Sequence, residues 1–257
     1  MIISHKYRFI FIKSAKVAGT SVEMFLSSVG GPSDVCTPFW HEEEGHEARN
    51  YKGLFDPFAE LRFRAKMGQP YQQSGFSRTV SDFFALRKFF EPMPAWQVRA
   101  RIPRRVWRDY LKFTIERNPW EKVVSRYYHS RRVFRDKYGG DLSWRGFLDY
   151  LEEQLQKPWS TPAWSSPAPY NIPRYADPIT GEVLVDKIIR YERLNEELTT
   201  LFSGLGVPFS GSLKERAKAG YREDKNPYWE ELGDEERRRV ERIFAAEIRL
   251  LGYRWRG

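Results

Sequence analysis

Residues 7–31 read YRFIFIKSAKVAGTSVEMFLSSVGG, and the rest of the chain can be interpreted from this segment outward. Tyr7–Ile12 is a run of aromatic and β-branched residues, which predicts a buried strand. The polar residues Lys13–Lys16 follow it as a loop. Val22–Ser28 then has apolar residues at helical spacing, and a Gly-Gly-Pro sequence ends the helix. The segment therefore predicts a strand, a loop and a helix in succession.

Two later segments repeat the order of strand followed by helix. Tyr110–Glu116 predicts a second strand, and Trp120–Arg135 predicts the helix after it, with Pro119 at the first helical position. Val183–Tyr191 predicts a third strand, and Glu192–Leu205 predicts the following helix. This alternation favours an α/β fold with a central, mostly parallel sheet flanked by helices.

We expect a single domain over residues 1–257 that contains two irregular insertions, at about 50–108 and 157–178. The first insertion shows no clear period, and we expect irregular structure with short helices there. The second is rich in proline, which is typical of a long loop. Further helices are expected over 142–156, with Ser143 as the N-cap, and over 234–251.

Charge and composition restrict the class of protein. The 43 Lys and Arg residues outnumber the 34 Asp and Glu residues, so the net charge is +9, and the surface should attract anions of many kinds. The single cysteine, Cys36, excludes an internal disulfide and suits a reducing compartment, so we expect a cytoplasmic protein. No apolar run approaches the roughly 18 residues of a membrane span, and no signal peptide is expected.

The loop between the first strand and its helix has the character of an anion site. Gly19 lets the backbone approach a phosphate, Thr20 and Ser21 add hydroxyl donors, and Lys16 adds a positive charge. The lysine precedes the glycine, unlike the GxxxxGK[ST] loop of nucleotide kinases, so an ordinary ATPase or GTPase loop is not expected. From these residues alone, an ordinary strand-to-helix turn is an equally good interpretation.

The end of the second strand carries a second candidate anion site. Arg117 leaves the strand where open α/β sheets bind ligands, and Ser125 lies eight residues later on the predicted helix. Arginine is a natural bidentate partner of phosphate, and a serine hydroxyl can add a donor. The alternative is a strand-end charge and a surface serine with no ligand.

The two motifs together resemble those of the sulfotransferases that use PAPS, 3′-phosphoadenosine-5′-phosphosulfate. Lys16–Ser21 is similar to the PKxxGTS loop of that family, and Arg117–Ser125 is similar to its RNPxxRxxSxY motif. Asp186–Leu194 and Leu251–Tyr253 resemble further family segments, and the carbohydrate sulfotransferases, including soluble bacterial ones, are the most similar subgroup. The resemblance covers about two-thirds of the chain. It implies a P-loop-like fold of three layers.

The sequence departs from the family pattern at two positions. Ala15 stands where the loop often has proline, and Lys122 stands where the second motif often has arginine. Lysine keeps the charge of arginine but not its planar fork of donors. Neither change removes a residue that the implied chemistry requires.

The resemblance implies transfer of a sulfuryl group from PAPS to a hydroxyl of a carbohydrate-like or other small acceptor. Lys16 would lie near the oxygen that bridges sulfur and phosphorus, where charge develops. Arg117 and Ser125 would hold the 3′-phosphate. The other implied ligands are the 5′-phosphate loop residues Val17, Ala18, Gly19, Thr20 and Ser21, and the basic residues Arg216, Lys218 and Arg222, which would close over the 3′-phosphate. No metal is expected.

The general base and the acceptor site are less well marked. We rank His46 and His41 ahead of Glu42 as the base, and we expect the carboxylates of Glu42–Glu44 to raise the histidine pKa. The same glutamates are also typical of a solvated acidic patch. Four aromatic residues are candidates to stack on sugar rings or, alternatively, to anchor the second insertion: Trp159, Trp164, Tyr170 and Tyr175.

Two other functions remain open at this point. The chain could be a non-catalytic binder of nucleic acid or another polyanion, because of its net charge and the basic, aromatic segment 99–110. No standard nucleic-acid motif supports this alternative, so no specific nucleic-acid partner is expected. The chain could also have a sulfotransferase fold that binds the nucleotide without turnover, because no general base is obvious.

Overall fold

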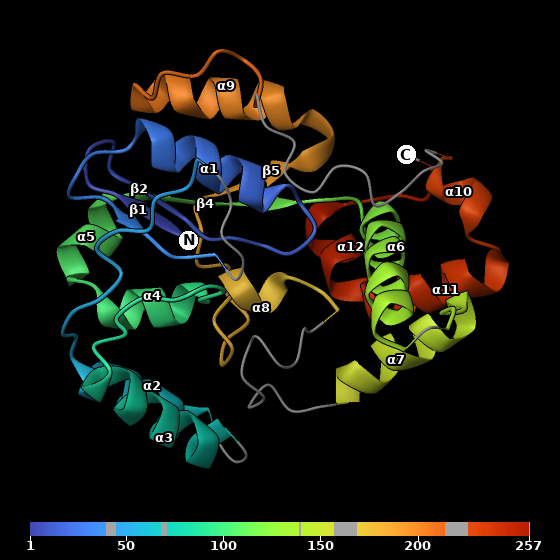
Figure 1. The fold of residues 1–257 in the computed structure, drawn as a ribbon, viewed down its shortest axis with the longest axis horizontal. Helices are drawn as coiled ribbons and strands as arrows, with labels where there is room; N and C mark the ends of the chain where they lie inside the picture. Colours follow the sequence, from blue (N-terminus) through green and yellow to red (C-terminus); the bar gives the residue numbers. More distant parts are fainter. Residues whose placement is uncertain (40–44, 68–70, 139, 157–168, 214–225, 257) are drawn as a thin grey trace.

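The computed structural model describes residues 1–39, 45–67, 71–138, 140–156, 169–213 and 226–256 (Figure 1). It has a mixed α/β fold around one five-stranded sheet, with the order β3-β1-β2-β4-β5. The strands are β1 (Ile2–Ser4), β2 (Phe9–Phe11), β3 (Val35–Cys36), β4 (Leu111–Glu116) and β5 (Lys187–Arg190). β2, β4 and β5 run parallel, whereas β1 pairs antiparallel with β2 and β3. The mostly parallel sheet centre predicted from the sequence is confirmed.

The side chains of β2 alternate between two apolar layers. Phe9 and Phe11 pack in the layer that contains Val22 and Phe202, from α1 (Gly19–Val29) and α9 (Leu194–Leu205). Ile10 packs in the opposite layer, which is covered by α4 (Ala95–Arg101), α5 (Arg104–Asp109) and α8 (Ile172–Tyr175). Since successive strand residues face opposite sides, this alternation fixes the register of the sheet between its helices.

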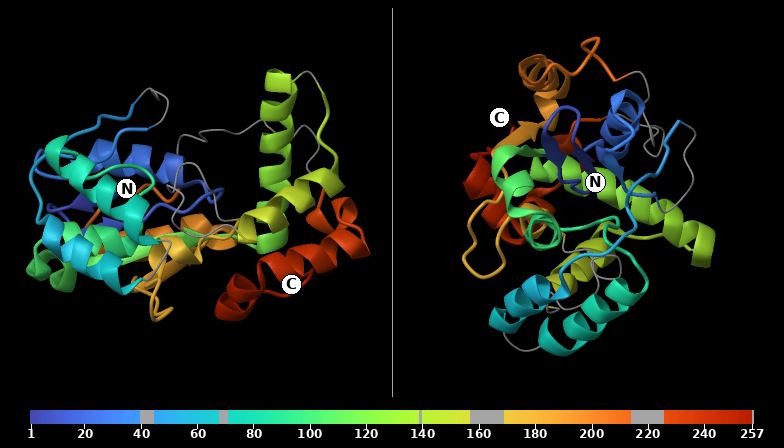
Figure 2. Two further views of the ribbon diagram at one scale, coloured as in Figure 1. Left: turned by 90° about the horizontal axis from the view of Figure 1, so that it is seen from below. Right: turned by 90° about the vertical axis from the view of Figure 1, so that its left-hand side faces the viewer.

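A third apolar cluster joins helices beyond one end of the sheet, on the right in Figure 1 and in the left panel of Figure 2. These helices are α6 (Pro119–Tyr138), α7 (Trp144–Gln156), α10 (Tyr228–Glu231), α11 (Asp234–Ile243) and α12 (Ala245–Leu251). Trp120, Phe147 and Phe244 are fully buried at their centre. The predicted N-cap of α7 is confirmed, because Ser143 Oγ accepts a hydrogen bond from Gly146 N at 3.1 Å.

The first insertion contains a helical hairpin, so the helices expected there are present, and this part of the insertion is more regular than expected. α2 (Pro57–Lys66) packs against α3 (Tyr71–Phe84). Asp56 caps α2 by accepting a hydrogen bond from Phe58 N at 2.9 Å, and Pro57 occupies the first helical turn. The helices are weakly periodic in sequence because they bury charged side chains against α4 in place of a continuous apolar stripe.

Other differences from the sequence analysis concern boundaries. The helix expected over 234–251 divides at Phe244, whose φ and ψ of −105° and 17° interrupt the helix between α11 and α12. The strand expected over 183–191 is shorter, and its last residue lies in the 3₁₀ turn Tyr191–Arg193. β1 and β3 were not expected, because strands of three and two residues have no detectable period. Among the described residues, no helix is long and apolar enough to cross a membrane.

Candidate functional site

Both predicted anion motifs follow parallel strands that are neighbours in the sheet. β2 leads into the loop 12–18 and then α1, and β4 leads through Arg117 into α6. Ile12 N donates to Phe113 O at 2.9 Å, and Thr114 Oγ1 donates to Ile12 O at 2.7 Å. Ser14 Oγ lies 2.8 Å from Thr114 Oγ1. The two loops therefore start side by side at the carboxyl edge of the sheet, where α/β folds bind ligands.

The loop before α1 has an unusual backbone. Lys16 and Ala18 adopt left-handed conformations, with φ of 61° and 58°, although neither is a glycine. Left-handed residues cost an L-amino acid about 1–2 kcal/mol, and Val17 between them has no positive φ. Left-handed residues occur in the turn conformations whose successive N–H groups can form an anion-binding nest, so this loop is a candidate for one. The loop leads directly into the N-terminus of α1, where Ala18 supplies no capping side chain.

The predicted ligands in this loop differ in burial. Lys16 and Thr20 are half-buried, whereas Val17 and Ser21 are buried. Gly19 is required for close packing, because a Cβ at this position would lie 2.8 Å from Lys13 Cγ. Close packing against Lys13 therefore restricts residue 19 to glycine.

Lys13 has a role that the sequence analysis missed. Its ammonium group forms ion pairs with Glu23, at 2.6 Å, and with Glu91. It also lies 4.4 Å from the ring centroid of Phe39. These partners come from three separate segments, so no local pattern marks them. Lys13 ties the start of the loop to α1 and to the segment before α4.

His46 is the candidate base that the structure describes. Its ring stacks on Phe39, with 3.9 Å between centroids, and this ring in turn contacts Lys13 of the loop. His46 Nε2 lies 2.9 Å from Thr37 O, so it carries the proton that it donates there. His46 Nδ1 is buried without a hydrogen-bond partner. Burial lowers the pKa of His46, so the expected rise is wrong for this environment.

In the second motif, Asn118 begins α6. Its Oδ1 accepts hydrogen bonds from Trp120 N at 3.0 Å and Glu121 N at 3.3 Å, as an N-cap does. Asn118 N donates to Glu192 Oε1 at 2.5 Å, which fixes the cap against the segment after β5. The sequence Asn-Pro thus combines a cap and a first-turn proline, and it directs α6 away from the end of β4.

Arg117 lies at this edge with an acidic neighbour. Its Nε and Nη2 donate to Glu121 Oε2 at 3.2 and 3.0 Å, and its guanidinium carbon lies 4.4 Å from the ring centroid of Tyr191. The side chain is 16% exposed. Ser125 is half-buried one turn beyond Glu121, on the same face of α6. Glu121 therefore separates the two expected phosphate ligands along this face, a feature that the motif did not indicate.

Lys122, which replaces the arginine of the family motif, is a buried structural cation. Its Nζ donates to Glu116 Oε2 at 3.0 Å and also to Glu247 of α12. Burial, and after it the nearby charge of Glu247, raise the pKa of Glu116 to about 7, although Lys122 acts in the opposite direction. Lys122 therefore stabilises the end of β4.

Asn171 joins this buried group to the loop before α1. Its Oδ1 accepts from Ala15 N at 2.9 Å, and its Nδ2 donates to Ala15 O at 3.2 Å and to Glu116 Oε2 at 3.3 Å. Its backbone N donates to Glu247. A side chain that pairs with both polar groups of residue 15 fixes the loop backbone. Nothing in the local sequence marks Asn171, since its partners lie far along the chain.

The remaining predicted residues have varied outcomes. Tyr175 is 0% exposed in the core, so the stacking role proposed for it is wrong, and its anchoring role is confirmed. Tyr170 is half-buried and packs against the α6–α7 cluster. Several predicted residues lie outside the described residues: His41, Glu42, Trp159, Trp164, Arg216, Lys218 and Arg222. Within the described ranges, no cluster of His, Cys, Asp or Glu has the arrangement of a metal site.

The basic segment 99–110 does not form a uniform positive face. Arg101 is fully buried between Glu60 and Asp82. Arg105 and Arg108 are exposed but both pair with Asp109. These pairings reduce the free charge on which the nucleic-acid alternative depends.

Comparison with known proteins gives one similarity to report. A protein of Archaeoglobus fulgidus described as uncharacterized is 36% identical over 119 residues, which cover 45% of this chain and 84% of that protein. This chain therefore belongs to the same family as the archaeal protein. No family model matches the chain, and no solved structure matches it. The description of the archaeal protein names no activity.

Proposed function

We propose that this chain is a PAPS-dependent sulfotransferase that acts on a hydroxyl of a carbohydrate-like or other small acceptor and releases PAP. The main support is the juxtaposition of two motifs that follow the neighbouring parallel strands β2 and β4. The first is the loop before α1 with its left-handed residues Lys16 and Ala18, and the second contains Arg117 and Ser125. The proposal includes a P-loop-like arrangement of the three layers. It also includes a cytoplasmic location, for which the buried free thiol of Cys36 is the support.

The loop residues would hold the 5′ end of the donor. The backbone N–H groups of Gly19, Thr20 and Ser21 begin α1 and are suited to phosphate oxygens. Lys16 would neutralise the charge that develops on the oxygen leaving sulfur, an interaction that is stronger in the transition state than in the ground state. Asn171 would act indirectly, by fixing the peptide groups of Ala15.

Arg117 and Ser125 would hold the 3′-phosphate, the group that distinguishes PAPS from ATP. Tyr191 supports the flat guanidinium group of Arg117 from one side. Two donors of this group contact Glu121, so phosphate would use the remaining donors or displace that carboxylate. Binding of the 3′-phosphate is therefore opposed by Glu121.

His46 fits the requirements of a general base better than its sequence neighbourhood suggested. Its lowered pKa favours the neutral ring, and donation from Nε2 to Thr37 O leaves the lone pair on Nδ1. A neutral imidazole with a free lone pair can take the proton of an acceptor hydroxyl. Access to Nδ1 requires movement of the groups that bury it, and His41 and Glu42 remain alternatives.

Calorimetry with PAP, AMP, ATP and a DNA duplex tests this proposal. Wild-type protein should bind PAP most tightly. A charged bidentate contact contributes roughly 1.5–3 kcal/mol, so Arg117→Ala should weaken PAP binding by about one to two decades and barely change AMP binding. Arg105→Ala, which removes an exposed arginine elsewhere, should change neither.

Several outcomes would contradict the proposal. Equal losses for PAP and AMP in Arg117→Ala would remove the 3′-phosphate assignment. Tighter binding of DNA than of PAP would favour the polyanion-binding alternative. PAP binding without sulfation of any acceptor in a screen with labelled PAPS would favour a nucleotide-binding protein without turnover.

A further inference from the structure

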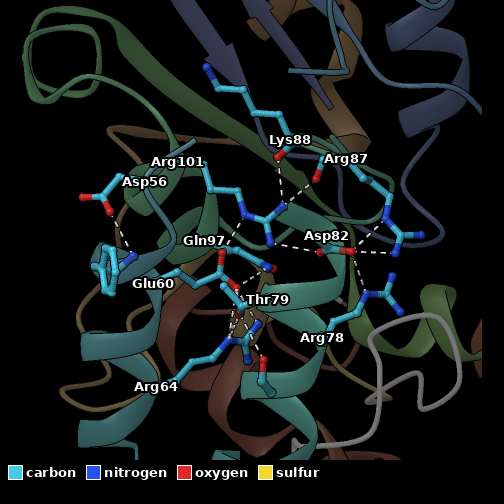
Figure 3. A network of polar contacts seen from close by, with 12 residues as sticks. Asp56, Glu60, Arg64, Arg78, Thr79, Asp82, Arg87, Lys88, Gln97 and Arg101 are labelled. Carbon is cyan, nitrogen blue, oxygen red and sulfur yellow. Dashed lines mark hydrogen bonds and ion pairs between the residues drawn. The ribbon is translucent and has the colours of Figure 1, made fainter. Parts of the chain in front are cut away.

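The α2–α3 hairpin buries charged side chains and exposes apolar ones, which reverses the usual arrangement of an amphipathic helix pair. Glu60 of α2 and both Thr79 and Asp82 of α3 are fully buried on the inner faces of the helices. Arg101 of α4 pairs with Glu60 at 2.6 Å and with Asp82 at 3.0 Å (Figure 3). Ion pairs and hydrogen bonds therefore anchor the hairpin to α4.

Five apolar side chains of the hairpin and its flanking residues are exposed: Leu54, Phe58, Val80, Phe84 and Leu86. Phe58 and Phe84 are 68% and 79% exposed, more than any other aromatic residue in the described part of the chain. Exposed apolar residues that occur singly are ordinary, whereas a group of them is typical of an interaction surface. We call this group of five the apolar patch.

The apolar patch lies toward the end of the hairpin where α2 begins and α3 ends. Gly53 N donates to Leu86 O at 2.8 Å, so Leu54 and Leu86 are on adjacent segments of the chain. Val80 and Phe84 are one turn apart on the same face of α3. The hairpin is peripheral, with α4 between it and the sheet, in Figure 1 and in the right panel of Figure 2. The patch is therefore carried by a projecting element.

Positive charge accompanies the apolar patch. Residues 51–90 contain seven Lys and Arg residues but three acidic residues, of which Glu60 and Asp82 are buried. Arg62 follows Phe58 by one turn on the same face of α2. The fully exposed basic residues of this segment are Lys52, Arg62 and Lys66. The outer surface of the hairpin is therefore both apolar and basic.

An anionic lipid surface is complementary to this combination. Apolar side chains that project from a protein insert at the boundary between headgroups and acyl chains, and nearby Lys and Arg are attracted to acidic headgroups. A protein partner would need a shaped pocket for each projecting phenylalanine. A bilayer accepts these side chains without such pockets, so it suits a convex surface better.

We propose that the α2–α3 hairpin docks this protein on anionic membranes, with the apolar patch at the lipid interface and the basic residues at the headgroups. Docking of this kind is peripheral and requires no membrane-spanning helix. The inference goes beyond the proposed sulfotransferase function and uses none of the residues assigned to PAPS, so either can fail without the other.

The first test is co-sedimentation with vesicles of phosphatidylcholine alone and with vesicles that also contain phosphatidylglycerol. Wild-type protein should bind the phosphatidylglycerol vesicles more tightly, and added salt should weaken this binding. Phe58→Ser combined with Phe84→Ser should weaken it roughly tenfold or more, because two apolar side chains no longer leave water. The control Val133→Ser, which changes an exposed apolar residue of α6, should bind as wild type does.

A second pair of variants tests the charge. Arg62→Glu combined with Lys66→Glu should also weaken binding roughly tenfold or more. Arg105→Glu combined with Arg249→Glu makes the same change in net charge on other helices, and it should retain most of the binding. The melting temperature of the double phenylalanine variant should be unchanged or higher, because both side chains are exposed in the folded protein.

A fluorescent label reports insertion directly. Cys36 is buried, so a thiol-reactive, polarity-sensitive fluorophore should label Phe84→Cys and Val133→Cys at the introduced thiol and leave wild type unlabelled. Vesicles with phosphatidylglycerol should shift the emission of labelled Phe84→Cys to shorter wavelength and leave that of labelled Val133→Cys unchanged.

Four results would each overturn the proposal. They are no binding of wild type to the phosphatidylglycerol vesicles, undiminished binding of either double variant of the hairpin, the same emission shift at both labelled positions, and a fall in melting temperature in the double phenylalanine variant. A wild-type dimer that this variant dissociates, without vesicle binding by wild type, would assign the patch to contact between two copies of the chain.

Discussion

Glu60 in the α2–α4 region and Glu116 at the end of β4 are both fully buried glutamates, but their surroundings differ. Glu60 accepts from Arg101 at 2.6 Å, from Arg64 and Gln97 at 2.8 Å, and from Thr79 at 2.7 Å (Figure 3). Glu116 has the ammonium group of Lys122, which it shares with Glu247, and the amide of Asn171.

The difference appears in the pKa of each carboxyl group. Burial alone would raise both, but two arginines and the neutral donors hold the pKa of Glu60 below its ordinary value. Burial and the neighbouring Glu247 raise the pKa of Glu116 to about 7, because one lysine serves two carboxylates. The number of cations per carboxylate therefore decides whether a buried carboxyl group has a raised or a lowered pKa. The well-compensated network stabilises a scaffold, and the under-compensated one lies beside the candidate ligand site.

The largest effect should come from breaking the Glu60 network. Arg101→Met removes a fully buried cation that holds both Glu60 and Asp82. We expect unfolding free energy to fall by about 3–5 kcal/mol, as for buried pairs left with one partner, measured by urea denaturation. The exposed control Arg105→Met should change it by less than about 0.5 kcal/mol. If Arg101→Met changed the unfolding free energy as little as the control does, the Glu60 network would not stabilise the fold. The comparison with Glu116 would then be wrong.

A change at the strand-end site should affect turnover more than stability. We expect Lys16→Ala to lower kcat by on the order of 10²–10³, as for loss of one donor to a developing charge, in an assay with labelled PAPS and an acceptor from the screen. Its unfolding free energy should change little, because Lys16 is half-buried in a loop. If the unfolding free energy fell by as much as the activation free energy rose, Lys16 would be a residue that supports the fold and not the transfer step.

The contributions of Glu116 and Glu60 to the free energy of unfolding should change in opposite directions as the pH rises. The pKa of Glu116 is about 7 in the folded protein and near 4.5 when unfolded, so the folded state binds more protons between these values and stability falls as pH rises through this range. Glu116→Gln should remove that fall, which amounts to about 3 kcal/mol at 1.36 kcal/mol per pKa unit.

Glu60 supplies the matched comparison. Its pKa is lowered in the folded state, so its contribution is present above the unfolded value near 4.5 and is lost as pH falls through the folded value. Glu60→Gln should therefore flatten the acid side of the stability profile. Urea denaturation from pH 8 down to about pH 2.5, below the unfolded value of Glu60, measures both slopes, and slopes of the same sign would contradict the comparison.

The smallest effect should come from the exposed part of the site. Glu121→Gln removes the negative charge that pairs with Arg117. We expect PAP affinity to rise about threefold, since a partly exposed pair contributes less than about 1 kcal/mol, and AMP affinity to stay unchanged in calorimetry. Glu196→Gln, which breaks the surface pair with Arg193, is the control. A loss of PAP affinity in Glu121→Gln would mean that Glu121 orients Arg117 for binding.

Local patterns in the chain were sufficient to predict the strand–loop–helix units around Phe9–Phe11 and Leu111–Glu116, the helix stop at Gly30 and the cap at Ser143. These features depend on residues a few positions apart, so their physical causes, alternation, capping and turn geometry, can be read directly from the order of residues. The family resemblance implied that the two motifs hold one ligand, whereas their juxtaposition depends on the pairing of β2 with β4, which no local pattern specifies.

Tertiary structure alone determined the partners of the buried charges and the exposure of the aromatic residues. Asn171 holds Ala15 across 156 residues of chain, and Lys122 meets Glu247 across 125. Tyr175 lies in the core although its segment is rich in loop-forming residues. Contacts between distant segments depend on which loops close and which surfaces are buried together, and a local period carries no information about either.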